Sequence, residues 1–162
     1  MDSQKKGQFV GFIDRSGFWI EDEVFSDREC DDLIEAAPLG MHGRSRAGAR
    51  HLMVIPAIEA ATKDERLLRI ARRALSPGAV PFRSTLFDKS ATANWLVVWH
   101  QDTALPLESR IEVHVPRGGV LAMRPLLVHS SSKARSGEPR RVLHLEYADA
   151  LDLKPGLRLA IA

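Results

Sequence analysis

The chain is predicted to fold as one α+β domain, mainly β, with N-terminal helices packed on a β-rich core. Its 162 residues are 44% hydrophobic and 27% charged, which suffices for a single buried core. Helical apolar spacing is confined to the first half, and short β-type runs follow from Val80 onward. We therefore expect a single domain over 1–162, with a helical layer over 1–79, a β core over 80–150 and a C-terminal tail over 151–162.

Three elements are predicted in the helical layer. The aromatic and β-branched run Gly17-Phe-Trp-Ile20 is typical of a strand. Ser26-Asp-Arg-Glu29 has the spacing of a capping box and predicts a helix over 27–37. A second capping box at Thr62-Lys-Asp-Glu65 predicts a further helix, which Ser76-Pro-Gly78 ends.

The rest of the chain is predicted as strands and loops. The Gly- and Arg-rich residues 40–50 have no apolar period and indicate a loop. In the second half, apolar runs bounded by turn residues predict strands at 80–87, 94–100, 111–115, 119–123, 126–130 and 140–147.

Composition excludes several classes of protein. The lone Cys30 cannot form an intramolecular disulfide or a thiolate metal cage, and it suits a reducing cytoplasm. No apolar run reaches the ~18 residues that a membrane span needs. The basic segment 43–83 lacks aromatic platforms for bases, and the net charge is only +2. We expect a cytoplasmic protein that acts on a small molecule, without nucleic-acid or membrane partners.

Candidate metal ligands lie at the ends of two predicted strands. His100 and Asp102 are two residues apart, so strand alternation puts them on one face. A mixture of imidazole and carboxylate suits Fe(II). Because His-x-Asp is short enough to occur by chance, the pair gains weight from His129, which ends an apolar strand in a Ser-rich exit. His129 is the candidate third ligand.

A guanidinium near these strands could bind a dicarboxylate in bidentate fashion. Arg140 and Arg141 both begin the last predicted core strand. Alternation separates them: Arg140 shares a face with Val142, His144 and Glu146, and Arg141 shares one with Leu143, Leu145 and Tyr147. The more polar face suits a wet cavity and favours Arg140, with Arg141 as the alternative.

Three segments resemble the phytanoyl-CoA dioxygenase family of Fe(II)- and 2-oxoglutarate-dependent oxygenases: Trp99-His-Gln-Asp102, Arg124-Pro-Leu-Leu-Val-His129 and Arg140-Arg-Val-Leu-His-Leu-Glu-Tyr147. The resemblance implies a double-stranded β-helix core, also called a jelly roll or cupin-like fold. It implies that Fe(II) is bound by His100, Asp102 and His129. It also implies that Arg140 and Ser131 bind the distal carboxylate of 2-oxoglutarate, and that the protein uses O2 to hydroxylate a small organic or acyl substrate.

The spacing between Asp102 and His129 departs from this family. Four core strands should lie between them, which needs at least ~30 residues. Only the 26 residues 103–128 are present, and some of them belong to the His129 strand. We therefore expect an incomplete core with an exposed sheet edge, which a homodimer could cover. The alternative function is a catalytically inactive, truncated member that binds a metal or small acid or serves as an interaction domain.

Overall fold

The computed structural model describes residues 13, 15–37, 49–89, 94, 96–100, 112–124, 127, 129–133 and 138–162. Asp102, and residues 40–48 of the predicted loop, lie outside the described residues. The chain divides into two compact units, each built from two separate stretches of sequence. Unit 1 comprises Met1–Cys30 and Trp95–Lys133, and unit 2 comprises Asp31–Asn94 and Ala134–Ala162.

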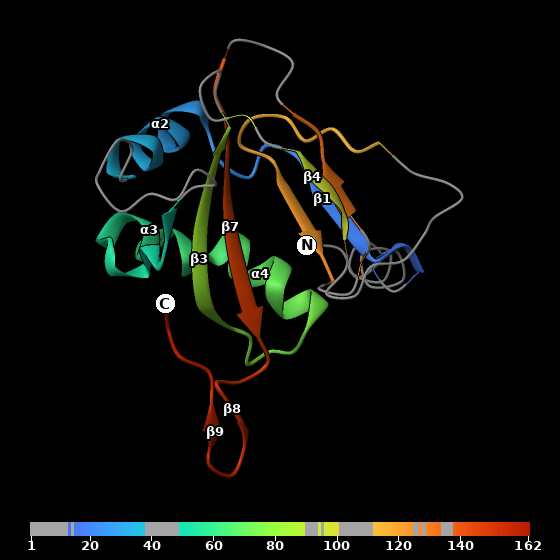
Figure 1. The fold of residues 1–162 in the computed structure, drawn as a ribbon. Coiled ribbons are helices and arrows are strands. Elements are labelled where there is room, and N and C mark those ends of the chain that lie inside the picture. Colours follow the sequence, from blue (N-terminus) through green and yellow to red (C-terminus); the bar gives the residue numbers. More distant parts are fainter. Residues whose placement is uncertain are drawn as a thin grey trace. The chain divides into compact units, whose positions relative to one another are not determined.

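Unit 2 contains a three-stranded antiparallel sheet. Its strands are β2 (Ala49–Arg50), β3 (Val80–Lys89) and β7 (Arg140–Ala148), in the order β2-β3-β7. The long strands β3 and β7 lie side by side in Figure 1. Their register runs from the Val80–Ala148 pair to the Lys89–Arg140 pair, with an irregularity between Pro81 and Arg83.

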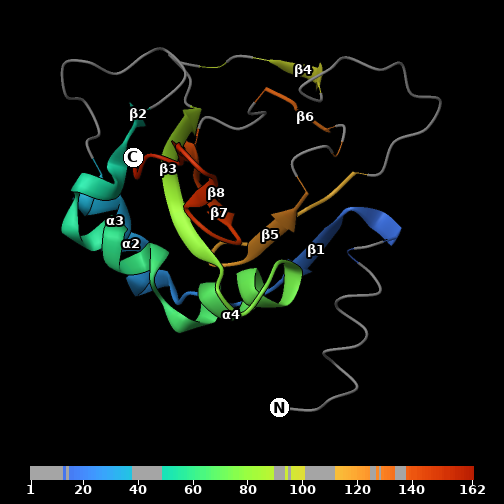
Figure 2. The ribbon, with the colours of Figure 1, turned by 90° about the horizontal axis from the view of Figure 1, so that it is seen from below.

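Three short helical segments precede β3 in unit 2. They are η1 (Leu52–Val54), α3 (Pro56–Thr62) and α4 (Glu65–Ala74). The sequence did not predict α3, because it begins with a proline at its first turn and lacks a polar side-chain cap. Proline suits that position, where its missing N–H is not needed. Figure 2 shows α3 and α4 beside the β3 strand of this unit.

The helices of unit 2 pack on one face of its sheet. Leu52, Ile58 and Leu86 form a buried cluster, and Leu143 of β7 packs against it. Burial of each such side chain contributes roughly 1.5–3 kcal/mol relative to exposure. On the same face of β7, the Tyr147 hydroxyl donates a 2.8 Å hydrogen bond to a backbone carbonyl at the end of α3. The face of β7 that carries Leu143 and Tyr147 is therefore the face directed at the helices.

Unit 1 contains two separate antiparallel strand pairs. The first joins β1 (Phe18–Glu21) to β5 (Val120–Met123), and the second joins β4 (Val97–His100) to β6 (His129–Ser131). Figure 2 labels all four strands. The predicted strands near 17–20 and 119–123 are thus confirmed with shifted ends, and the pairing of β4 with β6 joins the strands that carry two of the three candidate metal ligands.

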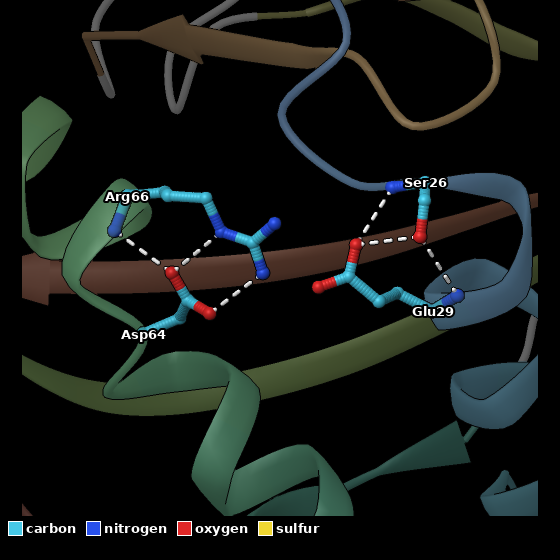
Figure 3. Close-up of polar contacts among 4 residues, drawn as sticks. All are labelled: Ser26, Glu29, Asp64 and Arg66. Carbon is cyan, nitrogen blue, oxygen red and sulfur yellow. Dashed lines mark hydrogen bonds and ion pairs between the residues drawn. The ribbon is translucent and has the colours of Figure 1, made fainter.

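The first predicted capping box is confirmed at the start of α2 (Asp27–Ala36). The Ser26 backbone N–H donates to Glu29 Oε2 at 2.8 Å, and the Glu29 N–H donates to Ser26 Oγ at 3.3 Å (Figure 3). The two residues thereby satisfy donors that the helix itself cannot.

The second predicted capping box, Thr62 to Glu65, is wrong. Thr62 is the last residue of α3, and its hydroxyl donates to the Glu59 carbonyl at 2.7 Å. Asp64 caps α4 instead: its Oδ1 accepts from the Arg66 backbone N–H at 2.8 Å (Figure 3). An aspartate directly before the helix reaches the first free N–H groups, which a hydroxyl two residues earlier cannot.

Two further segments differ from the sequence prediction. Residues 112–115, predicted as strand, are irregular in the part that is described. Residues 151–162, predicted as a tail, contain the hairpin β8 (Asp152–Lys154) and β9 (Leu157–Arg158). Beyond it, the Ala162 backbone exchanges two hydrogen bonds of 2.8 and 3.0 Å with β3. Within the described ranges, none of the helices has the length and hydropathy needed to cross a membrane.

Candidate functional site

Two of the candidate metal ligands are register partners. His100, the last residue of β4, lies directly opposite His129, the first residue of β6. The pairing is irregular between Val97 and His100. Directly opposite residues of an antiparallel pair have Cβ atoms about 4.5–5.5 Å apart. The two strand ends therefore bring both histidine positions to one place in unit 1, although the structure describes only the backbone of His100.

The imidazole of His129 is held in a defined orientation. Its Nδ1 lies 2.8 Å from the Leu127 carbonyl oxygen. Because a carbonyl only accepts, Nδ1 must carry the proton, and the lone pair of the neutral ring is then on Nε2. Histidines that bind metals usually donate their other ring N–H to a carbonyl or carboxylate in this way. The half-buried His129 thus has the tautomer that a metal ligand requires.

The segment that carries this carbonyl is hydrogen-bonded to the backbone of Gly17 through Arg124. The Arg124 N–H donates to the Gly17 carbonyl at 2.9 Å, and the Leu127 N–H donates to the Arg124 carbonyl at 3.0 Å. Gly17 has φ +77°, and a Cβ there would lie 2.8 Å from Leu127 Cδ1. Only glycine combines this φ with the close approach of the leucine. Sequence reasoning missed both residues, since a backbone carbonyl leaves no trace in residue type.

One side chain of the predicted metal centre, that of His129, lies among the described residues. Among the side chains that it describes, no three His, Cys, Asp or Glu residues gather into a metal-binding group. The side chain of His100 and the whole of Asp102 lie outside that set. Of the proposed ligands, His129 fits a metal by its tautomer, and the donor set of two imidazoles and one carboxylate suits Fe(II).

The two candidate carboxylate-binding arginines lie on opposite faces of β7. Arg141 faces the helices with Leu143, and its Nε lies 3.5 Å from Oδ1 of the largely buried Asp88. Asp88 is 7% exposed, so Arg141 serves to compensate a buried charge. Arg140 lies on the other face and is exposed. Both arginines are exposed, so the choice of Arg140 over Arg141 as the carboxylate ligand stays a prediction.

Lys89 is a further cation beside Arg140 that sequence reasoning did not identify. It is the register partner of Arg140 in the β3–β7 pair, and it is 3% exposed. Burial and the neighbouring Arg140 charge lower the pKa of Lys89, in that order of importance. In sequence, Lys89 ends the face of β3 that also carries Arg83, Thr85 and Phe87, so its burial leaves no sequence signal.

Ser131, the other predicted carboxylate ligand, lies in β6 of unit 1. It is half-buried and is the register partner of Val97. Arg140 belongs to unit 2. The two residues are therefore described each within its own unit, and their shared role stays a prediction.

Solved structures with a similar fold include three proteins. The first is the non-heme α-ketoglutarate-dependent epimerase SnoN from nogalamycin biosynthesis, with a TM-score of 0.78, 16% identity, and coverage of 93% of this chain and 85% of that one. EvdMO1 gives a TM-score of 0.69 at 18% identity and covers 88% of this chain, which spans half of EvdMO1. AviO1 from Streptomyces viridochromogenes Tue57 gives a TM-score of 0.66 at 18% identity, with 99% and 100% coverage.

These likenesses bear on the fold alone, because the sequence identities are low. No family model matches the chain, and no curated protein matches it. The phytanoyl-CoA dioxygenase family is therefore not singled out. The chain has a mixed helix and strand fold with antiparallel sheets, similar to that of the non-heme α-ketoglutarate-dependent epimerase SnoN.

Proposed function

We propose that this protein is a non-heme Fe(II)- and 2-oxoglutarate-dependent oxygenase. One observation carries the proposal: His100 and His129 are register partners, and His129 Nδ1 is held by a carbonyl so that Nε2 can bind a metal. The likeness to SnoN, a non-heme α-ketoglutarate-dependent epimerase, supports the same function.

Each residue of the proposed site has one role. His100, Asp102 and His129 would hold Fe(II) on one side of the ion and leave the remaining positions to cosubstrates. Arg140, with Ser131, would bind the distal carboxylate of 2-oxoglutarate through charge-assisted hydrogen bonds. Bound Fe(II) would supply O2 activation coupled to oxidative decarboxylation of 2-oxoglutarate. The protein residues would bind and orient the metal and its cosubstrate and keep water out of the site.

The finer assignment is hydroxylation of a small organic or acyl substrate by a member of the phytanoyl-CoA dioxygenase type. The motifs around His100, His129 and Arg140 support it. SnoN is an epimerase, so epimerisation of the substrate is the second reaction that this kind of site supports. The two outcomes differ in whether a hydroxyl group or a hydrogen returns to the substrate carbon. Mass spectrometry distinguishes them, since only hydroxylation adds the mass of oxygen.

The experiment that tests the proposed activity is substrate-independent turnover. The purified protein, with Fe(II), O2 and ascorbate, should convert 2-oxoglutarate to succinate faster than the His129→Ala variant does. His114→Ala is the matched control, because His114 is a highly exposed histidine of the same unit. Succinate formation equal in the protein and in His129→Ala would refute the activity. It would favour the truncated, catalytically inactive binding or interaction domain, which the short spacing between Asp102 and His129 supports.

Two properties of the proposed enzyme follow from composition and topology. We propose that it acts in the cytoplasm, where its single thiol stays reduced. We also propose a homodimer that covers an exposed strand edge. Light scattering of the purified protein measures the second property directly: a monomeric mass at all concentrations would exclude the dimer.

A further inference from the structure

The hairpin of β8 and β9, which extends beyond β7 in unit 2 (Figure 1), has one aliphatic face. Asp152 lies opposite Arg158 in the register, and their ion pair of 2.8 Å lies on the other face. By strand alternation, the face away from this pair carries only aliphatic side chains. These are Leu151, Leu153, Leu157, Leu159 and, just beyond β9, Ile161.

The aliphatic face is largely open to solvent. Leu153, Leu157 and Ile161 are 54%, 47% and 61% exposed. Leu151 and Leu159, which a backbone hydrogen bond of 2.8 Å joins at the base of the hairpin, are half-buried. Neighbouring aliphatic side chains exposed to water are unfavourable, and such a surface is typical of an interaction site.

Two opposite charges stand at the two ends of β8. The exposed Asp149 lies at the base of the hairpin, after β7, and the exposed Lys154 ends β8 next to the turn. Within the ranges that the structure describes, neither side chain has an ion-pair partner, whereas Asp152 between them is paired with Arg158. Five residues separate the two charges, so they are at most about 18 Å apart along the chain.

We propose that this aliphatic face docks against the same face of a second copy of the chain, with the two hairpins antiparallel about a two-fold axis. Such an axis exchanges the ends of β8 and brings Lys154 of each copy to Asp149 of the other. The charges are then complementary at both ends while the leucines cover each other. A parallel arrangement, or a partner with one sign of charge, would leave one of the two residues facing a like charge or none.

The inference rests on the homodimer that belongs to the proposed function, and it names the contact surface of that homodimer. It does not depend on the oxygenase activity. The contact and the activity can therefore fail separately.

Sedimentation of matched variants over a concentration series tests the aliphatic contact. The natural protein should pass from monomer to dimer between about 1 µM and about 1 mM, as expected for a small interface. Leu153→Ser should raise the dissociation constant at least about tenfold, because each copy loses an exposed leucine from the contact. Urea unfolding of the dilute monomer should be nearly unchanged, because this side chain is exposed in the single chain. Val54→Ser, at an 82% exposed valine of the same unit, is the matched control and should change neither quantity.

Charge reversal tests the two-fold arrangement. Asp149→Lys and Lys154→Asp each place like charges at both ends of the contact and should weaken the dimer about tenfold at low salt. An equimolar mixture of the two variants should associate as tightly as the natural protein, because every heterodimer has opposite charges at both ends. The double variant should dimerise in the same way. Asp32→Lys makes the same change of charge on α2 and should leave the dissociation constant unaltered.

Several results would overturn the assignment. A natural protein that stays monomeric over the whole range excludes both this contact and the homodimer. A dimer that Leu153→Ser does not weaken is formed by another surface, and a Leu153→Ser monomer that is strongly destabilised shows that its own chain covers this face. Reversed variants that stay weak when mixed exclude the two-fold arrangement. Conversion of 2-oxoglutarate is measured separately, so none of these results decides the oxygenase activity.

Discussion

His100 lies directly opposite His129 across the antiparallel pair of β4 and β6. The two residues are far enough apart in sequence that only the pairing of these strands brings them together. The Leu127 carbonyl then fixes the His129 ring through a 2.8 Å hydrogen bond. The relationship depends on the pairing of the two strand ends and not on the length of the segment between them.

Removal of the His129 imidazole should abolish high-affinity metal binding. His129→Ala takes away one of three ligands, and we expect affinity for Fe(II) or Co(II) to fall by more than about 100-fold. His114→Ala, which removes an exposed imidazole of the same unit, should bind metal normally. Equal metal affinity in the two variants would show that His129 is not a ligand. Calorimetric titration with Co(II) measures both.

Substitution of Gly17 should weaken the metal centre without touching a ligand. In Gly17→Ala the new Cβ meets the Leu127 side chain at 2.8 Å and the φ of +77° is strained, so we expect the segment whose carbonyl orients His129 to shift. We expect about a tenfold loss of Co(II) affinity, as is typical for groups that orient a ligand. Gly156→Ala is the matched control, because it has a similar φ of +80° but open space around the Cβ. Indistinguishable Co(II) affinities for the two variants would exclude this positioning role.

Substitution of Arg141 should lower the stability of the fold, whereas substitution of Arg140 should weaken ligand binding. Arg141→Met removes the guanidinium partner of the largely buried Asp88 and should destabilise the fold by roughly 1–3 kcal/mol. Arg140→Met should leave stability nearly unchanged and weaken binding of 2-oxoglutarate. Urea unfolding and ligand titration of both variants measure the two effects. The reverse pattern, with Arg141→Met stable and unable to bind, would assign the carboxylate to Arg141.

Ionisation of Tyr147 should make the protein less stable in strong alkali. Burial and the charge of Asp64 raise the pKa of Tyr147 well above its usual 10.0. Above about pH 10 the unfolded chain loses the phenol proton while the folded chain keeps it, so the free energy of unfolding falls as pH rises. The chain has one tyrosine, so phenolate absorbance reports this group alone. Coincident titration curves for folded and urea-unfolded protein would contradict the raised pKa.

Local signals in the sequence were sufficient for some elements and misleading for others. The Ser26–Glu29 capping box was correct because both partners of that motif are side chains that the sequence displays. The Thr62 cap was wrong because a competing aspartate, Asp64, stands closer to the free N–H groups of α4. Helix α3 was missed because its start depends on the proline geometry of Pro56, without a polar cap.

Some features of the candidate site could likewise be predicted from the sequence, and others could not. His100, His129 and the face of Arg140 were accessible from residue type and alternation. The pairing of β4 with β6 followed only from the resemblance, since strand pairing is a long-range property. The carbonyl of Leu127 and the burial of Lys89 were not accessible, because each depends on which segments pack together in three dimensions.

The central claim is that His100, Asp102 and His129 bind Fe(II) together with 2-oxoglutarate. Its most direct test is an anaerobic titration of the folded protein with both, followed by visible absorbance. We predict a saturable metal-to-ligand charge-transfer band that requires both Fe(II) and 2-oxoglutarate and is absent from His129→Ala. A folded protein that gives no band at saturating Fe(II) and 2-oxoglutarate would contradict the account.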